Sequence, residues 1–259
     1  MNDASHTSDG AVRRVTETPG GDGFPGLVHP SWSQRWPWLV QGVTVPGEGR
    51  DRDFGLFGSG PAGVVVEWWE GLLLATGMTA VVHARQPHGA TVRVHTLAGP
   101  GLHLSAPADA HAGRDAGLLM AVTVADCVPA FLVAQRARAV AMVHAGWRGA
   151  AAGILERAVA LLGERFGVHP GETALHLGPS ICGDCYEVGP EVHEALGEPV
   201  PDGPMPVDLP ANLARRARSL GIPEEETTRS SLCTLCGPVD FFSHRRGDAG
   251  RQVGFLGVR

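Results

Sequence analysis

The chain of 259 residues is long enough for one large domain or two small ones, and its 43% apolar and 19% charged residues exclude a disordered protein. Its 21 basic and 27 acidic side chains give a net charge of −6, which excludes a general electrostatic attraction to nucleic acid or to anionic membranes. Small molecules are therefore the expected partners, with no nucleic acid and no membrane. Five cysteines, an odd number in a chain that can fold without disulfides, favour free or metal-bound thiols.

Residues 1–23 are polar and contain no apolar stretch, so they are predicted to form a disordered N-terminal tail without the character of a signal peptide. The apolar runs elsewhere are much shorter than the ~20 residues that span a bilayer. These features predict a cytoplasmic protein. Residues 24–259 contain no long linker and no internal repeat, so they are predicted to form a single domain.

In chain order, residues 64–66 are predicted to form a short strand, and the apolar spacing of residues 68–74 predicts a helix that ends at Gly77. Helical spacing predicts two more helices, one that follows Gly149 and ends at Gly167, and one over residues 210–220 capped by Asp208. Short apolar or β-branched runs predict further strands at residues 79–83, 90–96, 118–124, 139–143, 174–177, 227–232, 239–244 and 252–258. Because strands and helices interleave without a regular period, the expected fold class is α/β (α+β), a single domain with mixed β-sheets flanked by helices.

Three side chains of metal-binding type fall where predicted strands end: His88, Cys127 and His144. Imidazole nitrogen and thiolate sulfur suit zinc, and three protein ligands leave a fourth position open for water or substrate, as in catalytic sites. The alternative is a buried thiol that packs as a small apolar side chain, with the two histidines hydrogen-bonded in turns. The residue types and their spacing leave both interpretations open.

A family resemblance rests on motifs that occur in order along residues 38–259. The most informative are Gln86-Pro87-His88-Gly89, Val124-Ala125-Asp126-Cys127-Val128-Pro129 and His144-Ala145-Gly146-Trp147-Arg148-Gly149. The series continues with Gly178-Pro179-Ser180-Ile181, Cys185-Tyr186-Glu187-Val188-Gly189, Asp208-Leu209, Cys233-Thr234, Phe241-Phe242-Ser243-His244-Arg245-Arg246 and Gly250-Arg251. With these motifs the chain resembles the YfiH-type family, also called the laccase-domain or peptidoglycan-editing-factor family, whose members are similar to purine nucleoside phosphorylases of broad activity.

The resemblance implies a zinc-dependent enzyme whose partners are purine nucleosides and phosphate. Its relatives are described as cleaving inosine, guanosine, adenosine and methylthioadenosine to the base and ribose 1-phosphate, and as deaminating adenosine. The family's metal ligands fall on His88, Cys127 and His144, and zinc rather than copper is the expected metal. Bound zinc would supply hydroxide for deamination or orient phosphate. The sequence leaves open whether the protein is a monomer or a homodimer.

Four further residues are candidates for catalysis or substrate binding. Asp126 precedes Cys127, so it is the candidate for proton handling, although it could instead accept hydrogen bonds from loop amides or orient a ligand. Arg148, Arg245 and Arg246 are candidates for contacts with phosphate or ribose, because a guanidinium offers paired donors; solvation at the surface is the alternative. Residues 54–58 and 70–71 depart from the family pattern, which leaves substrate contacts in that region open.

Two Cys-x-x-Cys pairs raise a separate metal hypothesis. Paired motifs of this type are typical of a tetrahedral zinc site with four thiolate ligands, so Cys182, Cys185, Cys233 and Cys236 are candidates for a second, structural zinc. Buried free thiols are the alternative.

Three other functions remain as alternatives. A copper-dependent polyphenol oxidase matches one label of the family, but a multicopper site needs many histidines and the chain offers one His-Cys-His set. A metal-independent hydrolase would use Cys127 as a nucleophile activated by His144. A non-enzymatic, peptidoglycan-linked accessory protein is suggested only by the family name.

Overall fold

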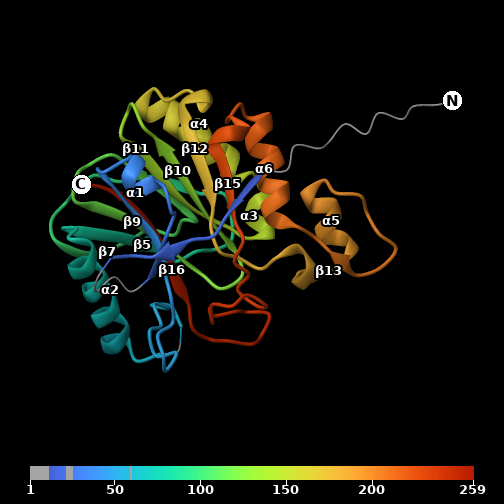
Figure 1. Cartoon of the computed structure of the whole chain (residues 1–259), viewed down its shortest axis with the longest axis horizontal. Coiled ribbons are helices and arrows are strands. Elements are labelled where there is room, and N and C mark those ends of the chain that lie inside the picture. Colours follow the sequence, from blue (N-terminus) through green and yellow to red (C-terminus); the bar gives the residue numbers. More distant parts are fainter. Residues whose placement is uncertain (1–11, 22–25, 59) are drawn as a thin grey trace.

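A computed structural model describes residues 12–21, 26–58 and 60–259. They form two mixed seven-stranded sheets that pack face to face, with helices on both outer faces (Figure 1). The expected single domain with mixed sheets flanked by helices is confirmed.

The first sheet combines parallel and antiparallel neighbours. In spatial order its strands are β1 (Arg13–Val15), β15 (Thr227–Ser230), β12 (Thr173–Leu177), β10 (Val128–Ala134), β11 (Ala139–Ala145), β8 (Ala110–Gly113) and β6 (Val92–Val94). Its outer face is covered by helices from the C-terminal half, namely α3 (Trp147–Ala151), α4 (Ile154–Phe166), α5 (Pro190–Leu196) and α6 (Leu209–Ser219).

The second sheet is likewise mixed. In spatial order its strands are β2 (Thr18–Pro19), β3 (Gly26–Val28), β4 (Leu39–Thr44), β16 (Gln252–Val258), β9 (Leu118–Val124), β5 (Ala80–Ala84) and β7 (Gly101–Ser105). The helix α2 (Ala62–Thr76) packs on its outer face, and the short α1 (Trp32–Arg35) packs near β4. A small ribbon of β13 (Glu187–Val188) and β14 (Met205–Pro206) lies outside both sheets.

The interior consists of three apolar layers. Between the sheets, Phe131 and Met142 of the first pack with Met120 and Leu256 of the second. The outer layers lie under α4 and α6 on one side and under α2 on the other. Most strands are therefore buried on both faces, which explains why the predicted strands were apolar runs rather than alternating patterns.

The prediction of a strand at residues 64–66 is wrong, because these valines belong to α2. The helix buries one stripe that includes Val65, Trp69 and Leu72, at the spacing of a helical face, and this packing outweighs the β-preference of valine. The predicted end of the helix is confirmed, since Gly77 caps it in the left-handed conformation at φ 66°.

The predicted strand at residues 239–244 is also absent from the described chain. Its buried Phe242 has no strand partner; instead the side chain of Gln252 accepts the Phe242 N–H at 2.8 Å and donates to the Phe242 carbonyl at 3.0 Å. One side chain thus satisfies the backbone groups that a neighbouring strand would otherwise satisfy.

The tail predicted for residues 1–23 is corrected for residues 12–21, which form β1 and β2. Glu17 explains this order: it is buried, and its carboxylate lies 2.9 Å from His176 Nε2 and accepts a hydrogen bond from Ser230 Oγ at 2.7 Å. Residues 1–11 and 22–25 lie outside the described residues, so the remainder of the prediction stays a prediction. Within the described ranges, no helix is long and apolar enough to cross a membrane.

Candidate active site

Three predicted metal ligands converge at an edge where the two sheets meet. His88 lies on the loop after β5, Cys127 on the short connection from β9 to β10, and His144 near the end of β11. Because β9 belongs to the second sheet and β10 to the first, this connection crosses between the sheets. The ligand atoms of the three residues all lie within 4.8 Å of one another.

The backbone around the cluster is unusual for its residue types. His88 and Asp126 both adopt positive φ, at 62° and 84°, a region that residues with a side chain rarely occupy and that is found preferentially at functional sites. Gln86 ties the His88 loop to β9, since its amide donates to the Thr123 carbonyl and accepts the Thr123 N–H. The sequence thus builds two tight turns that aim His88 and Cys127 at the same point.

Asp109 organises this cluster and was missed by the sequence reasoning. It precedes β8 and is fully buried. Its Oδ1 accepts the His88 N–H at 2.9 Å and lies 3.0 Å from His144 Nδ1, while its Oδ2 accepts the Gly89 N–H at 2.7 Å. Because a carboxylate accepts the Nδ1 proton of His144, Nε2 of that ring remains the free ligand atom. In the sequence, the only feature that could point to Asp109 is its position as the one acidic residue in a run of mostly small residues.

The electrostatics of the cluster favour a thiolate. Burial alone would raise the pKa of the Cys127 thiol, but His144 and His88 beside it lower that pKa to about 6. Burial would lower the pKa of His144, yet Cys127 and Asp109 raise it to about 9. At pH 7 these shifts describe a thiolate beside a protonated His144. A metal that took the place of that proton would meet two imidazoles and one thiolate, a donor set that suits zinc.

The backbone also leaves room for an ion beside these donors. A Cβ added at Gly146 would come within 2.9 Å of Cys127 Sγ and 3.5 Å of His88 Cδ2, so a side chain at that position would fill the space next to the cluster. The residues present therefore fit a bound metal.

The cluster opens into a cavity of about 430 Å³, within the range of roughly 300–1,000 Å³ typical of small-molecule sites. Phe57, 55% exposed, and the buried His83 form an aromatic wall, with ring centroids 5.8 Å apart. Arg85 and Arg251 also line the cavity, as does His244. The exposed Arg85 accepts the Ala108 N–H through its backbone carbonyl, and its guanidinium has no hydrogen bond or ion pair with the described residues.

Asp126 lies beside the cluster but does not line the cavity. Its Oδ1 accepts the Thr234 hydroxyl at 2.6 Å, and its Oδ2 accepts the Ser243 hydroxyl at 3.1 Å and the Arg245 N–H at 2.7 Å. These bonds favour the alternative interpretation, a carboxylate that fastens loops, and its role in proton transfer stays a prediction.

The three predicted substrate-binding arginines are also placed outside the cavity. Arg148 lies over the Trp147 ring at 4.3 Å, and Arg245 donates to the Glu187 carbonyl and lies over Tyr186. Arg246 pairs with Asp248 at 2.7 Å and with Asp240 at 3.3 Å. Their contact with phosphate or ribose therefore stays a prediction, and the arginines that line the cavity are Arg85 and Arg251.

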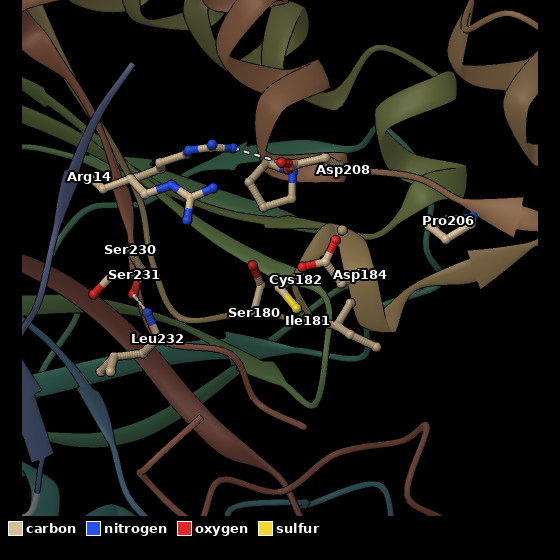
Figure 2. A pocket seen from close by; sticks show the side chains of 13 residues that line it. Arg14, Ser180, Ile181, Cys182, Asp184, Pro206, Asp208, Ser230, Ser231 and Leu232 are labelled. Atoms are coloured by element: carbon tan, nitrogen blue, oxygen red, sulfur yellow. Dashed lines mark hydrogen bonds and ion pairs between the residues drawn. The ribbon is translucent and has the colours of Figure 1, made fainter. Parts of the chain in front are cut away.

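The other four cysteines come together in a second cluster, with all sulfur atoms within 4.8 Å of one another. Burial raises the pKa of Cys233, but N–H donors from Cys236, Cys182 and Leu235 lower it to about 7. Burial and the neighbouring Cys236 and Cys182 raise the pKa of Cys185. Figure 2 shows Cys182 beside Ser180 and Asp184 among the side chains of a further cavity of about 280 Å³.

Comparison with known proteins places the chain in a family. Residues 62–259 match the family model described as "Multi-copper polyphenol oxidoreductase laccase". The purine nucleoside phosphorylase YlmD of Geobacillus stearothermophilus is 34% identical over 75% of this chain and 76% of its own. The adenosine deaminase RL5, from an unknown prokaryotic organism, is 34% identical over 71% of this chain and 77% of its own.

A solved structure agrees with these relatives. The crystal structure of YlmD from Geobacillus stearothermophilus superposes with a TM-score of 0.83, covering 94% of this chain and 98% of that one at 27% identity. The matched family model spans three quarters of the sequence and includes all seven histidine and cysteine residues of the two clusters. The chain therefore belongs to the YfiH-type laccase-domain family.

Proposed function

We propose that this protein is a zinc-dependent purine nucleoside phosphorylase that also deaminates adenosine. The observation that carries the proposal is the cluster of His88, Cys127 and His144 at the wall of a cavity large enough for a small molecule. The names of the relatives, purine nucleoside phosphorylase and adenosine deaminase, supply the substrate class.

His88, Cys127 and His144 would hold the metal, and Asp109 orients His144 for it. When bound, zinc supplies an activated water for deamination and a positive charge near phosphate. Three protein ligands would leave one coordination position for water or substrate, which is the arrangement expected of a catalytic rather than a structural site.

Other side chains that line the cavity suit the purine and the phosphate. Phe57 offers an exposed ring on which a purine can stack. Arg85 and Arg251 line the same space, and a guanidinium suits phosphate. One amino group of Arg251, Nη1, donates to the carbonyls of Asp248, Ala249 and Gly250, which holds this side chain in place. Cleavage of the glycosidic bond leaves positive charge on the sugar and negative charge on the departing purine, so a nearby phosphate anion held by arginine stabilises the sugar side.

His83 has a defined proton state in this cavity. Burial lowers its pKa to about 4, so its ring is neutral at pH 7. Its Nδ1 lies 3.2 Å from the Ala121 carbonyl, which can only accept, so Nδ1 carries the proton and Nε2 is an acceptor. A neutral acceptor beside Phe57 suits recognition of an N–H or amino group on a purine.

The decisive experiment couples metal analysis to a nucleoside assay. Purified protein incubated with inosine should release hypoxanthine only when phosphate is present, and it should convert adenosine to inosine without phosphate. His88→Ala should abolish both activities and lower the zinc content, whereas His103→Ala, a histidine outside the cluster and the cavity, should change neither. Full activity of His88→Ala, or hypoxanthine release that is independent of phosphate, contradicts the proposal.

One observation favours a second candidate function. Cys127, His144 and Asp109 lie in the order of a nucleophile, a base and an orienting carboxylate, as in cysteine hydrolases. That mechanism needs no third ligand, so it predicts activity that survives both His88→Ala and chelation, together with a covalent adduct on Cys127. Loss of activity on chelation and its recovery with zinc separate the phosphorylase from this alternative.

The copper oxidase named in the family description has less support in the structure. Within the described ranges the possible metal clusters are one of two histidines and one cysteine and one of four cysteines, and neither resembles a histidine-rich multicopper centre. We also propose a cytoplasmic location, which the five free thiols support because a reducing compartment keeps them available to a metal.

A further inference from the structure

The four-cysteine cluster joins two loops that leave neighbouring strands. Cys182 and Cys185 follow β12, and Cys233 and Cys236 follow β15, its parallel neighbour in the first sheet. Ser180 and Cys233 form an isolated β-bridge, and the Thr234 N–H donates to the Ser180 carbonyl at 3.1 Å. Both loops therefore leave the sheet side by side, and the β-bridge holds the two Cys-x-x-Cys pairs opposite each other.

The spacing of the sulfur atoms fits one tetrahedral ion. A zinc–sulfur distance of about 2.3 Å places the ligands of a regular tetrahedron about 3.8 Å apart. The Cys182 and Cys236 sulfurs are 3.8 Å apart, and all four lie within 4.8 Å of one another. Four thiols this close together form the donor set that zinc prefers in structural sites.

The surrounding backbone supports thiolate ligands. Three N–H groups, from Cys182, Leu235 and Cys236, lie 3.3 to 3.5 Å from Cys233 Sγ, so the sulfur accepts up to three hydrogen bonds. Hydrogen bonds from several donors stabilise the charged form of an acceptor, and donors around a metal ligand fix its orientation. This arrangement prepares Cys233 as a ligand before an ion arrives.

We propose that Cys182, Cys185, Cys233 and Cys236 bind one zinc ion in a closed, structural site. All four coordination positions are taken by protein thiolates, so the ion has no open position for substrate. Its role is to lock the loop after β12 to the loop after β15.

The locked loops lie against the connection that carries a ligand of the active site. The Ile181 N–H donates to the Asp126 carbonyl at 3.0 Å, and the Thr234 hydroxyl donates to the Asp126 carboxylate at 2.6 Å. Ile181 precedes one ligand, Cys182, and Thr234 follows another, Cys233. Asp126 in turn precedes Cys127, so the structural ion supports the backbone from which the active-site thiolate projects.

The test is a metal count on the full chain and on matched cysteine variants, each expressed with zinc. Wild-type protein should carry two zinc ions per chain. Cys127→Ala should retain one, held by the four-cysteine cluster, and Cys236→Ser should also retain one, held by the active site. The double variant Cys127→Ala/Cys236→Ser should carry none. If the active site binds no zinc, wild type and Cys127→Ala both carry one ion and Cys236→Ser none, so failure of the proposed function is distinguishable.

Two further measurements complete the test, and the second uses wild-type protein, so it does not depend on the folding of a variant. In cobalt-substituted Cys127→Ala protein, the sulfur-to-cobalt absorption of a four-thiolate site should persist. In native wild-type protein, Cys182, Cys185, Cys233 and Cys236 should resist alkylation until a chelator removes the metal. One zinc per wild-type chain that disappears in Cys127→Ala, rapid alkylation of the four thiols before chelation, iron in place of zinc, or disulfides among these cysteines would each overturn the proposal.

Discussion

Asp109 provides the sharpest test of how the fold prepares the metal centre. Its carboxylate accepts three hydrogen bonds, from His88 N, Gly89 N and His144 Nδ1. In Asp109→Asn the shape is kept, but one oxygen becomes an NH2 group. Whichever way the amide turns, that NH2 faces at least one N–H donor, so at least one hydrogen bond to a buried charged group is lost.

A hydrogen bond to a charged group contributes about 1.5–3 kcal/mol, which corresponds to roughly 10–100-fold in a binding constant. Removal of the residue that orients a metal-binding histidine typically weakens metal affinity by the same roughly 10–100-fold. We therefore expect Asp109→Asn to bind zinc at the active site about 10–100-fold more weakly, with a parallel fall in kcat/KM. The assay is competition for zinc with a coloured chelator at fixed pH, in a Cys236→Ser background that isolates the active site.

The matched control is Asp115→Asn, since Asp115 accepts the Leu97 N–H at 2.8 Å and makes no contact with the cluster. It should leave zinc affinity unchanged. A folded Asp109→Asn protein with the zinc affinity of the parent would refute the assignment of Asp109 as the residue that positions His144 and the His88 loop.

Three further outcomes are expected. Burial and the neighbouring His176 lower the pKa of His29 to about 3, below the unfolded value of 6.5. The stabilisation that comes from keeping this ring neutral is therefore complete above pH 6.5 and is lost as the pH decreases, by about 2 kcal/mol at pH 5. Urea unfolding of wild type should show this additional pH dependence, and urea unfolding of His29→Gln should not. Phe57→Ala should raise KM for nucleosides several-fold with little change in the melting temperature, because the ring is exposed in the cavity; an unchanged KM would exclude stacking. Gly254→Ala should destabilise the fold by about 1–3 kcal/mol, because its Cβ would lie 2.9 Å from Cβ of the rigid Pro129 and 2.8 Å from Met142 Cε. Gly71→Ala, in open space on α2, should stabilise the fold by about 0.5–1 kcal/mol. Equal denaturation midpoints for the two variants would contradict the packing described.

Local patterns predicted the elements whose signals are strong over short distances. The apolar spacing and Gly167 stop of α4, the Asp208 cap of α6 and the apolar runs of β9 and β11 are all present as expected. The strand expected at residues 239–244 is absent because the backbone of Phe242 pairs with the side chain of Gln252, 10 residues further along the chain, and not with a strand. Such a substitution of partners leaves no local trace.

The sequence also predicted the two sets of candidate metal ligands, since ligand chemistry and position at a strand end are both properties of short segments. Residue types, motif spacing and family resemblance point to the members of both clusters, and the structure brings each set together. It could not predict Asp109, because a carboxylate becomes an orienting group only when another strand brings it within 3.0 Å of His144.

By itself, then, the sequence determined the helices with a clear apolar stripe, the donor atoms of the two clusters and the net negative charge. The tertiary structure alone decided which of these donors converge, that Asp126 and Arg246 are occupied by neighbours, and that Arg85 and Arg251 face the cavity. The physical reason is that ligand chemistry and helical periodicity are properties of short segments, whereas convergence, burial and hydrogen-bond partnership depend on which distant strands pack side by side.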